Sequence, residues 1–146
     1  MHGLVHPLLS NCAFRRHVPA IGLPREELVQ VYRSHMHMLK WHRDHMHKPG
    51  HDITILFRLG RRRGLSTRPH DGATIGEPRT ISMEHGDLLV FGKDFNAWYE
   101  HAVQHGEVDE GAQGVSYGWA VWCSLKEGAT EEDLYEQLTE AGAVRA

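Results

Sequence analysis

The sequence predicts a mainly β protein, an all-β sandwich or barrel with a flanking helix. Short segments rich in apolar and β-branched residues follow one another at close spacing, and turn signals containing Gly, Pro or Asp separate them. The chain has 146 residues, of which 40% are hydrophobic and 24% charged, as in an ordinary globular domain. We therefore expect one domain over residues 1–146.

The strands are predicted in chain order after a start, 1–22, that shows no clean periodicity. Pro24 and the two glutamates after it favour a helix from Leu23, but a strand beginning near Val29 is equally consistent with the residues. Further strands are predicted at 53–59, near 65–67, and at 79–83, 87–92, 97–104 and 115–125.

The C-terminal segment has the pattern of a helix. Thr130 can cap its N-terminus, acidic residues follow at once, and Leu134 and Leu138 recur four residues apart. Gly142 marks the expected end of this helix. The acidic, glycine-rich stretch 105–114 is expected to be a loop.

Charge and composition exclude several classes of protein. The net charge of −3 argues against a surface built throughout for phosphate backbones, although a local basic patch remains compatible with it. No apolar run approaches the roughly 20 residues of a membrane span, and the start lacks the features of a signal peptide. Cys12 and Cys123 are too few for a disulfide framework. We expect an intracellular monomer, cytoplasmic or nuclear.

Histidine is the unusual component, with 13 residues in the chain. The tripeptide His42-Arg43-Asp44 would place an imidazole and a carboxylate on the same face of a strand. A second histidine from a distant strand, for which His101 is the candidate, would complete the two-His-one-carboxylate triad of non-haem Fe(II) oxygenases. As an alternative, His45, His47 and His51 could bind Zn, Ni or Cu by themselves.

Four stretches resemble AlkB-family dioxygenases in order and spacing. Tyr32-Arg33 and the WHRD of 41–44 are similar to the family's Y-R-x-G-x-D-x-x-G-x-H-x-D segment. LGRRRGLSTRPHDG (59–72) resembles L-G-x-x-R-x-F-x-F-R-H-K, and ISMEHGDLLVFGKDFNAWYEHAV (81–103) resembles L-x-H-G-D-L-L-V-M … W-x-H-x-V. The resemblance covers about residues 28–125.

The resemblance implies a double-stranded β-helix (jelly roll) that uses Fe(II), 2-oxoglutarate and O₂. It implies a DNA-repair type of activity, in which an alkyl group on a base of DNA or RNA is hydroxylated and leaves as formaldehyde. By the same resemblance His42, Asp44 and His101 bind iron. Tyr32 contacts 2-oxoglutarate, and the arginines Arg63 and Arg68 position substrate or its phosphates.

The chain departs from the family at several positions. The family anchors the far carboxylate of 2-oxoglutarate with an arginine on the last strand, whereas GVSYGWAVWCSL (114–125) has none. Lys126, just beyond, is the candidate substitute, as a point charge. Gln30 replaces the family's asparagine two residues before the tyrosine. The family's N-terminal lid is short or missing, as in a chain truncated at that end.

Three alternatives remain open at this point. The same fold could act on a substrate other than nucleic acid. The chain could be a family member that binds metal without catalysis. The third alternative is a histidine-rich metal-binding protein unrelated to the family. The four tryptophans are expected in the core, with stacking on an extruded base as the alternative.

Overall fold

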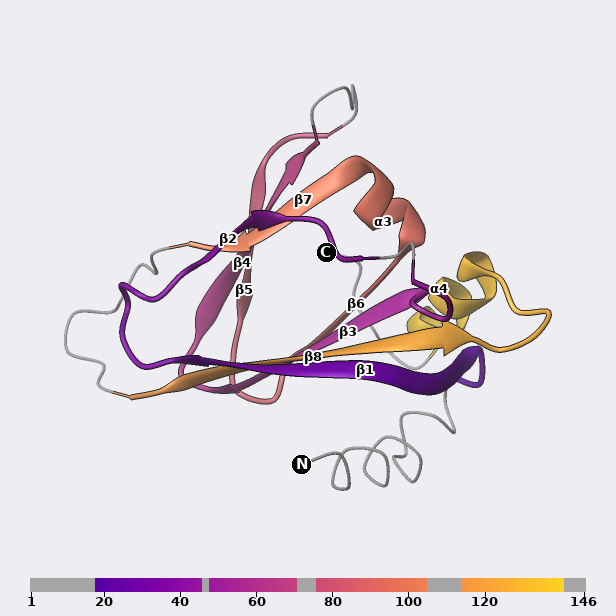
Figure 1. Ribbon diagram of the computed structural model, residues 1–146, viewed down its shortest axis with the longest axis horizontal. Helices are drawn as coiled ribbons and strands as arrows, with labels where there is room; N and C mark the ends of the chain where they lie inside the picture. The colour runs from indigo at the N-terminus through magenta and orange to yellow at the C-terminus, as the bar shows by residue number, and fades with distance from the viewer. Residues whose placement is uncertain (1–17, 46–47, 71–75, 105–113, 141–146) are drawn as a thin grey trace.

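The computed structural model describes residues 18–45, 48–70, 76–104 and 114–140, and within them the chain forms two antiparallel four-stranded sheets (Figure 1). The first sheet has the order β1 (Ile21–Tyr32), β8 (Ser116–Leu125), β3 (Ile53–Gly60) and β6 (Leu88–Gly92). The second has the order β2 (Leu39–His42), β7 (Tyr99–Val103), β4 (Arg63–Pro69) and β5 (Arg79–Met83).

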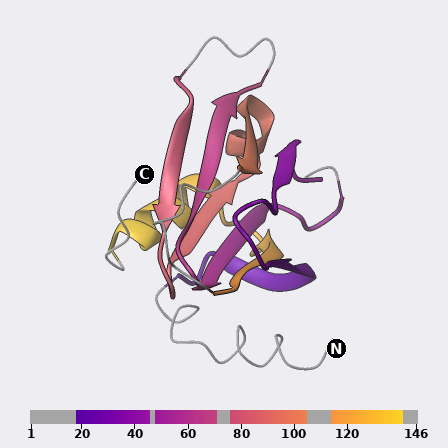
Figure 2. The ribbon, with the colours of Figure 1, turned by 90° about the vertical axis from the view of Figure 1, so that its left-hand side faces the viewer.

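The connectivity is that of a jelly roll, because the chain crosses repeatedly between the sheets instead of completing one before the other. This confirms the predicted fold class, which is mainly β with few helices. Both ribbon views show β4 and β5 running steeply across the direction of β1 and β8 (Figure 2).

Two helices complete the described part of the fold. α3 (Lys93–Trp98) connects β6 to β7, and α4 (Glu131–Glu140) follows β8. The buried Leu134 and Leu138 of α4 pack with Ile55 and Val121 on the outer face of the first sheet. The sequence predicted α4 from its cap, and Thr130 does accept a hydrogen bond from the backbone N–H of Asp133 at 3.1 Å.

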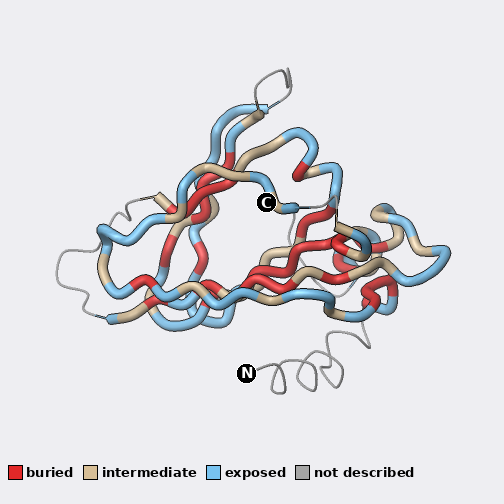
Figure 3. Tube along the Cα trace, viewed as in Figure 1, coloured by how far each residue is buried: buried red, intermediate tan, exposed pale blue. Residues whose placement is uncertain are grey.

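A second core lies between the sheets. It contains Leu56 and Ala120 of the first sheet and Leu65 and Val103 of the second. The buried segments in Figure 3 follow these strands. Because side chains alternate along a strand, Thr54 and the other even-numbered residues of β3 face the second sheet, while its odd-numbered residues face α4.

Most predicted strands are confirmed, with three differences. The ambiguous segment after Leu23 is a strand, and Pro24 is accommodated because β1 is an edge strand with register shifts on both sides of that proline. The strand predicted at 97–104 begins at Tyr99, since Ala97 and Trp98 end α3. Asp44 follows the end of β2 instead of lying within the strand.

Some expectations fall outside the described residues: the irregular start over 1–17 with Cys12, most of the loop 105–114, and Gly142. Cys123 is buried. No helix of the described ranges is long and apolar enough to cross a membrane.

His51 is a buried titratable side chain near the inner face of the first sheet. It is 5% exposed, its ring stacks on Trp122 with centroids 5.9 Å apart, and its Nδ1 lacks a hydrogen-bond partner. Burial lowers the pKa of His51 from the usual 6.5 and outweighs the opposing effect of Glu26, whose Oε2 lies 3.5 Å from Nε2.

A folded-state pKa below 6.5 means that the unfolded chain binds this proton more readily. His51 therefore contributes a stability that is present above that pH and is lost as the pH falls. In wild type, this effect lowers the free energy of unfolding between about pH 7.5 and about pH 5.5. We expect His51→Gln to lose less free energy over that interval, by up to about 1.4 kcal/mol for each unit by which the pKa of His51 is shifted.

Urea unfolding at the two pH values measures this difference. The same substitution at the exposed His35 is the matched control for exchanging a histidine for glutamine. An equal pH dependence in wild type and His51→Gln would contradict the prediction.

Candidate active site

Strand pairing brings two predicted metal ligands together. His42, the last residue of β2, is the register partner of His101 in β7. On its other side His101 pairs with Thr67 of β4, so its strand is held from both edges. The two imidazole rings have centroids 4.3 Å apart. Two residues that are 59 positions apart in the chain thus face the same space between the sheets.

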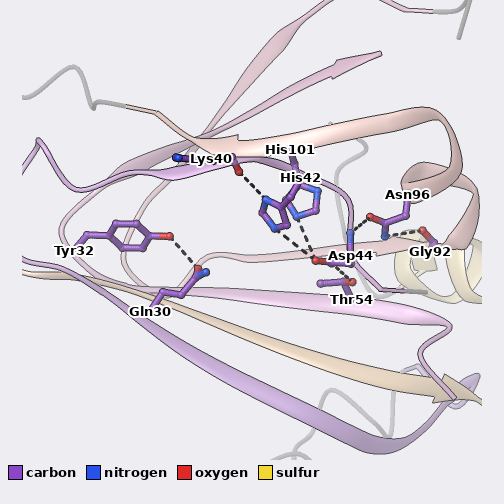
Figure 4. A network of polar contacts seen from close by, with 9 residues as sticks. All are labelled: Gln30, Tyr32, Lys40, His42, Asp44, Thr54, Gly92, Asn96 and His101. Atoms are coloured by element: carbon purple, nitrogen blue, oxygen red, sulfur yellow. Dashed lines mark hydrogen bonds and ion pairs between the residues drawn. The ribbon is translucent and has the colours of Figure 1, made fainter. Parts of the chain in front are cut away.

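Asp44 completes a group of three. Its Oδ1 lies 3.7 Å from Nε2 of His42 and 3.6 Å from Nε2 of His101. One ligand atom from each residue lies within 4.8 Å of the other two. Figure 4 shows the three side chains turned toward one another between the sheets. The side chains of Asp44 and His101 are 5% and 6% exposed and that of His42 is 35% exposed, so the group opens to solvent on the His42 side.

Neighbouring residues orient the three side chains. The hydroxyl of Thr54 donates to Oδ2 of Asp44 at 2.6 Å, which leaves Oδ1 directed at the histidines. The Asp44 backbone N–H donates to Oδ1 of Asn96, in α3, at 3.0 Å. His42 Nδ1 lies 2.8 Å from the carbonyl oxygen of Lys40. Since a carbonyl only accepts, Nδ1 carries the hydrogen and Nε2 presents its lone pair to the group.

The protonation states suit a metal ion. Burial raises the pKa of the Asp44 carboxyl, but hydrogen bonding and charge interaction with His101, with a further hydrogen bond from Thr54, outweigh burial and lower it overall. Burial and the neighbouring His101 lower the pKa of His42. At neutral pH the group therefore offers a carboxylate and a neutral imidazole, the forms that bind metals.

The donor set fits Fe(II). Two imidazoles and one carboxylate on one side of an open pocket are the arrangement of non-haem iron oxygenases. Among the residues that the structure describes, this is the group found with metal-ligand geometry. Of the alternative cluster, His51 instead packs on Trp122, His45 is exposed, and His47 is not described.

A pocket that is partly open to solvent extends from this group between the two sheets; its empty space, including the solvent at its mouth, is about 430 Å³. Its walls are mostly apolar and include Leu28, Leu39, Phe91 and Trp122. Besides the three ligands, the polar residues that line it are Gln30, Thr54 and Arg58. The pocket is thus an apolar chamber with polar groups at few positions, as small-molecule sites usually are.

Gln30 lines the β1 side of the pocket, and Tyr32, two residues further along β1, contacts Gln30 from outside the pocket lining. The Tyr32 hydroxyl donates to Oε1 of Gln30 at 2.9 Å, and Figure 4 shows the pair facing the histidines across the space between the sheets. Tyr32 is 4% exposed. Two guanidinium groups lie over its ring, that of Arg58 at 5.6 Å and that of Arg63 at 4.7 Å from the centroid.

The other predicted residues lie away from the pocket lining. Arg63 is 7% exposed and donates hydrogen bonds to backbone carbonyls, among them those of Ser34, His37 and Gln104. These bonds tie the β1–β2 connection to the end of β7. Because its N–H groups are used in this way, Arg63 stabilises the backbone around the site.

Arg68 and Lys126 are both exposed. Arg68 lies over the ring of Trp41 at 4.4 Å and its Nη2 is 2.7 Å from the Glu100 carboxylate, on the face of the second sheet opposite to the ligands. Lys126 follows the far end of β8, where its backbone N–H donates to the carbonyl of Ala20 at 2.9 Å.

Arg58 is the pocket residue that sequence reasoning missed. It stands in ITILFRL (53–59), which was interpreted only as a strand. Its position along the strand was an available signal. Arg58 lies two residues after Leu56 and four residues after Thr54, and alternate residues of a strand share one face. An arginine on the buried face of a strand is uncommon and calls for a partner.

Comparisons with known proteins agree with this geometry. Residues 12–129 match the 2OG-Fe(II) oxygenase superfamily. Among solved structures, an oxidoreductase of the 2OG-Fe(II) oxygenase family from Burkholderia pseudomallei matches with a TM-score of 0.51 at 14% identity. The match covers 74% of this chain and 49% of that protein, so the chain spans about half of its length. No curated protein matches the chain.

The hydrogen bond from Thr54 to Asp44 gives a testable expectation for metal affinity. Thr54→Val keeps the shape of the side chain but removes the hydroxyl, so Asp44 loses the bond that fixes Oδ2. We expect the fold to be retained and Fe(II) affinity to fall by about 10- to 100-fold, as measured by anaerobic titration.

Thr80→Val is the matched control. Thr80 is exposed on β5, an edge strand that carries no ligand, and its hydroxyl lies 3.1 Å from that of Ser66. Unchanged Fe(II) affinity in Thr54→Val would show that this bond does not orient the carboxylate.

Proposed function

The chain belongs to the 2OG-Fe(II) oxygenase superfamily, and on that premise we propose that it is an Fe(II)- and 2-oxoglutarate-dependent dioxygenase whose metal is held by His42, Asp44 and His101. The observation that carries this assignment is the meeting of the three ligand atoms within 4.8 Å at the wall of the pocket. When bound, iron couples the oxidation of 2-oxoglutarate by O₂, to succinate and CO₂, to the insertion of one oxygen atom into a substrate C–H bond.

The residues around the ligands support this chemistry by fixing geometry. The Lys40 carbonyl engages Nδ1 of His42, which leaves Nε2 to bind the metal. The Thr54 hydroxyl engages Oδ2 of Asp44, which leaves Oδ1 to bind it. Asn96 fixes the backbone of Asp44 from α3. The apolar walls limit water near the reacting groups, which protects a reactive intermediate from side reactions.

Tyr32 and Gln30 are proposed to contact 2-oxoglutarate. Their mutual hydrogen bond orients both polar groups on one wall, and Gln30 lines the same pocket as the metal ligands. The Gln30 amide retains its N–H groups as donors to a carboxylate. The Tyr32 hydroxyl donates to Gln30 in this structure, and we propose that it turns to donate to 2-oxoglutarate on binding, because a carboxylate only accepts.

For the substrate, we propose an N-alkylated base of DNA or RNA. The resemblance of residues 28–125 to AlkB-family enzymes supports this class. The exposed cations Arg33, Lys40 and Arg43 stand beside the pocket-lining residues of β2 and in the connection before it, where they can contact backbone phosphates. Trp122 offers an aromatic surface inside the pocket for an extruded base.

Anaerobic titration with Fe(II) and then 2-oxoglutarate tests the cofactor assignment. We expect one equivalent of each to bind and to produce the weak visible charge-transfer band of chelated 2-oxoglutarate. His101→Ala should abolish iron binding and the band, with circular dichroism unchanged. Iron binding without the band would indicate a metal-binding member without oxygenase chemistry. Several equivalents of Zn or Ni, bound equally by His101→Ala, would indicate an unrelated histidine-rich protein.

Formaldehyde release tests the substrate class. With an N-methylated single-stranded oligonucleotide, 2-oxoglutarate and O₂, we expect formaldehyde and succinate in equal amounts. The unmethylated oligonucleotide and the His101→Ala variant are the controls, and neither should give formaldehyde. Turnover of 2-oxoglutarate with no formaldehyde from the methylated oligonucleotide would assign the same fold to a different substrate.

A further inference from the structure

The pocket contains a buried cation without a counter-ion. Arg58 is 0% exposed and lines the pocket. Its Nη1 donates a hydrogen bond to the Ser116 hydroxyl at 3.3 Å, while Nε and Nη2 have no hydrogen-bond partner among the residues that the structure describes. A buried guanidinium carries five N–H donors and a full charge, and leaving most of them unsatisfied is costly.

The surroundings of Arg58 make the charge less stable rather than more. Burial lowers the pKa of its guanidinium, the interaction with Tyr32 opposes this, and the positive charge of Arg63 adds to it, so that the pKa is lowered overall. The ring of Tyr32 lies against both guanidinium groups, but it does not accept a hydrogen bond from the N–H groups that point outward in the guanidinium plane. Among the described residues no carboxylate forms an ion pair with Arg58. Such a cation is suited to an anion that enters from outside the chain.

Gly118 makes the space that Arg58 occupies. Gly118 of β8 is the register partner of Arg58 on one side and of Gln30 on the other. A Cβ at position 118 would lie 3.3 Å from Nη1 of Arg58 and 3.4 Å from Cε2 of Tyr32. A long side chain at position 118 would therefore occupy the same volume as the guanidinium of Arg58. In this chain the cation in that volume comes from β3 and not from β8.

Arg58 and the residue that holds Asp44 lie on the same strand, β3. Thr54, which holds Asp44, precedes Arg58 by four residues on the same face of β3, a separation of roughly 13 Å between their Cα atoms. The side chains of Arg58 and Asp44 shorten that gap, and a five-carbon diacid bound to the metal at one end has the length to reach the guanidinium at the other.

We propose that Arg58 binds the far carboxylate of 2-oxoglutarate and takes the role expected of an arginine on the last strand, in the volume that glycine at position 118 leaves free. This inference rests on the proposed function. It assigns the anchoring role to a residue of β3, and it removes the need for Lys126, which lies outside the pocket lining.

The test compares the full chain with Arg58→Met, which removes the charge and keeps an extended side chain, and with Lys126→Met as the matched control. Two ligands are titrated anaerobically onto the Fe(II) protein: 2-oxoglutarate, and 2-oxopentanoate, which has the same chain length but no far carboxylate. The charge-transfer band and calorimetry report binding, and urea unfolding without ligand reports stability.

We expect wild type and Lys126→Met to bind 2-oxoglutarate equally and to prefer it over 2-oxopentanoate by at least about 100-fold, since an Arg–carboxylate pair is lost with the second ligand. In Arg58→Met the preference should disappear while Fe(II) affinity is unchanged. The variant without ligand should be as stable as wild type or more stable, because an unpaired buried charge is gone. A purely structural arginine would instead lower stability and leave the ligand preference intact.

Each other outcome has a defined meaning. If wild type does not bind 2-oxoglutarate, the proposed function fails and this inference fails with it. If wild type binds and Arg58→Met keeps the preference, or if Lys126→Met loses it, only the inference is overturned. Should Arg58→Met not fold, the exchange variant Arg58→Gly/Gly118→Arg decides: an affinity for 2-oxoglutarate within about tenfold of wild type supports the assignment, and loss of binding overturns it.

Discussion

The antiparallel pairing of β2 with β7 is the interaction on which the rest of the site depends. It sets His42 opposite His101, and a shift of one residue would turn one imidazole to the outer face of the sheet. β2 has only four residues and lies at the edge of its sheet, so it has little pairing of its own. Contacts outside the strand pairing therefore hold His42 in position. One of them is the Arg63 guanidinium, which donates hydrogen bonds to backbone carbonyls of the connection leading into β2.

Polar groups between the sheets divide into satisfied and unsatisfied ones. Asp44 has a hydrogen bond on Oδ2 and another on its backbone N–H, so its orientation is fixed before any metal arrives. Two nitrogens of the buried Arg58 guanidinium have no partner within the described ranges. Since unsatisfied buried groups oppose folding, their presence at one pocket is typical of a site whose final partners come from solution.

The sequence predicted the sandwich for reasons that are local, because the strands after residue 50 alternate clearly or are uniformly apolar. The proximity of His42 and Asp44 is also local, since they are two residues apart, whereas His101 lies 59 positions from His42 and was a candidate through its place on a distant strand and through the family resemblance. α3 was not predicted because six residues, KDFNAW, contain too few turns for a helical period to show.

The residues that sequence reasoning did not place depend on contacts between strands. Arg58 acquires its role from lying opposite Gly118, and that pairing joins segments that are 60 positions apart. Arg63 was expected at the substrate, but its carbonyl partners come from the β1–β2 connection and from Gln104, which no periodicity identifies. Pro24 obscured β1 because its tolerance depends on the strand being at an edge.

α3 also constrains how the gene can change in length. The segment Lys93–Trp98 joins β6 directly to β7, supplies Asn96 to the backbone of Asp44, and presents Phe95 beside the ring of His101. One inserted or deleted codon here would turn His101 to the wrong face and remove the amide from Asp44 in a single event. The connection 33–38 carries no ligand, but its carbonyls accept hydrogen bonds from Arg63, so it too is constrained in length. Length variation among related chains is therefore expected to be absent between β6 and β7.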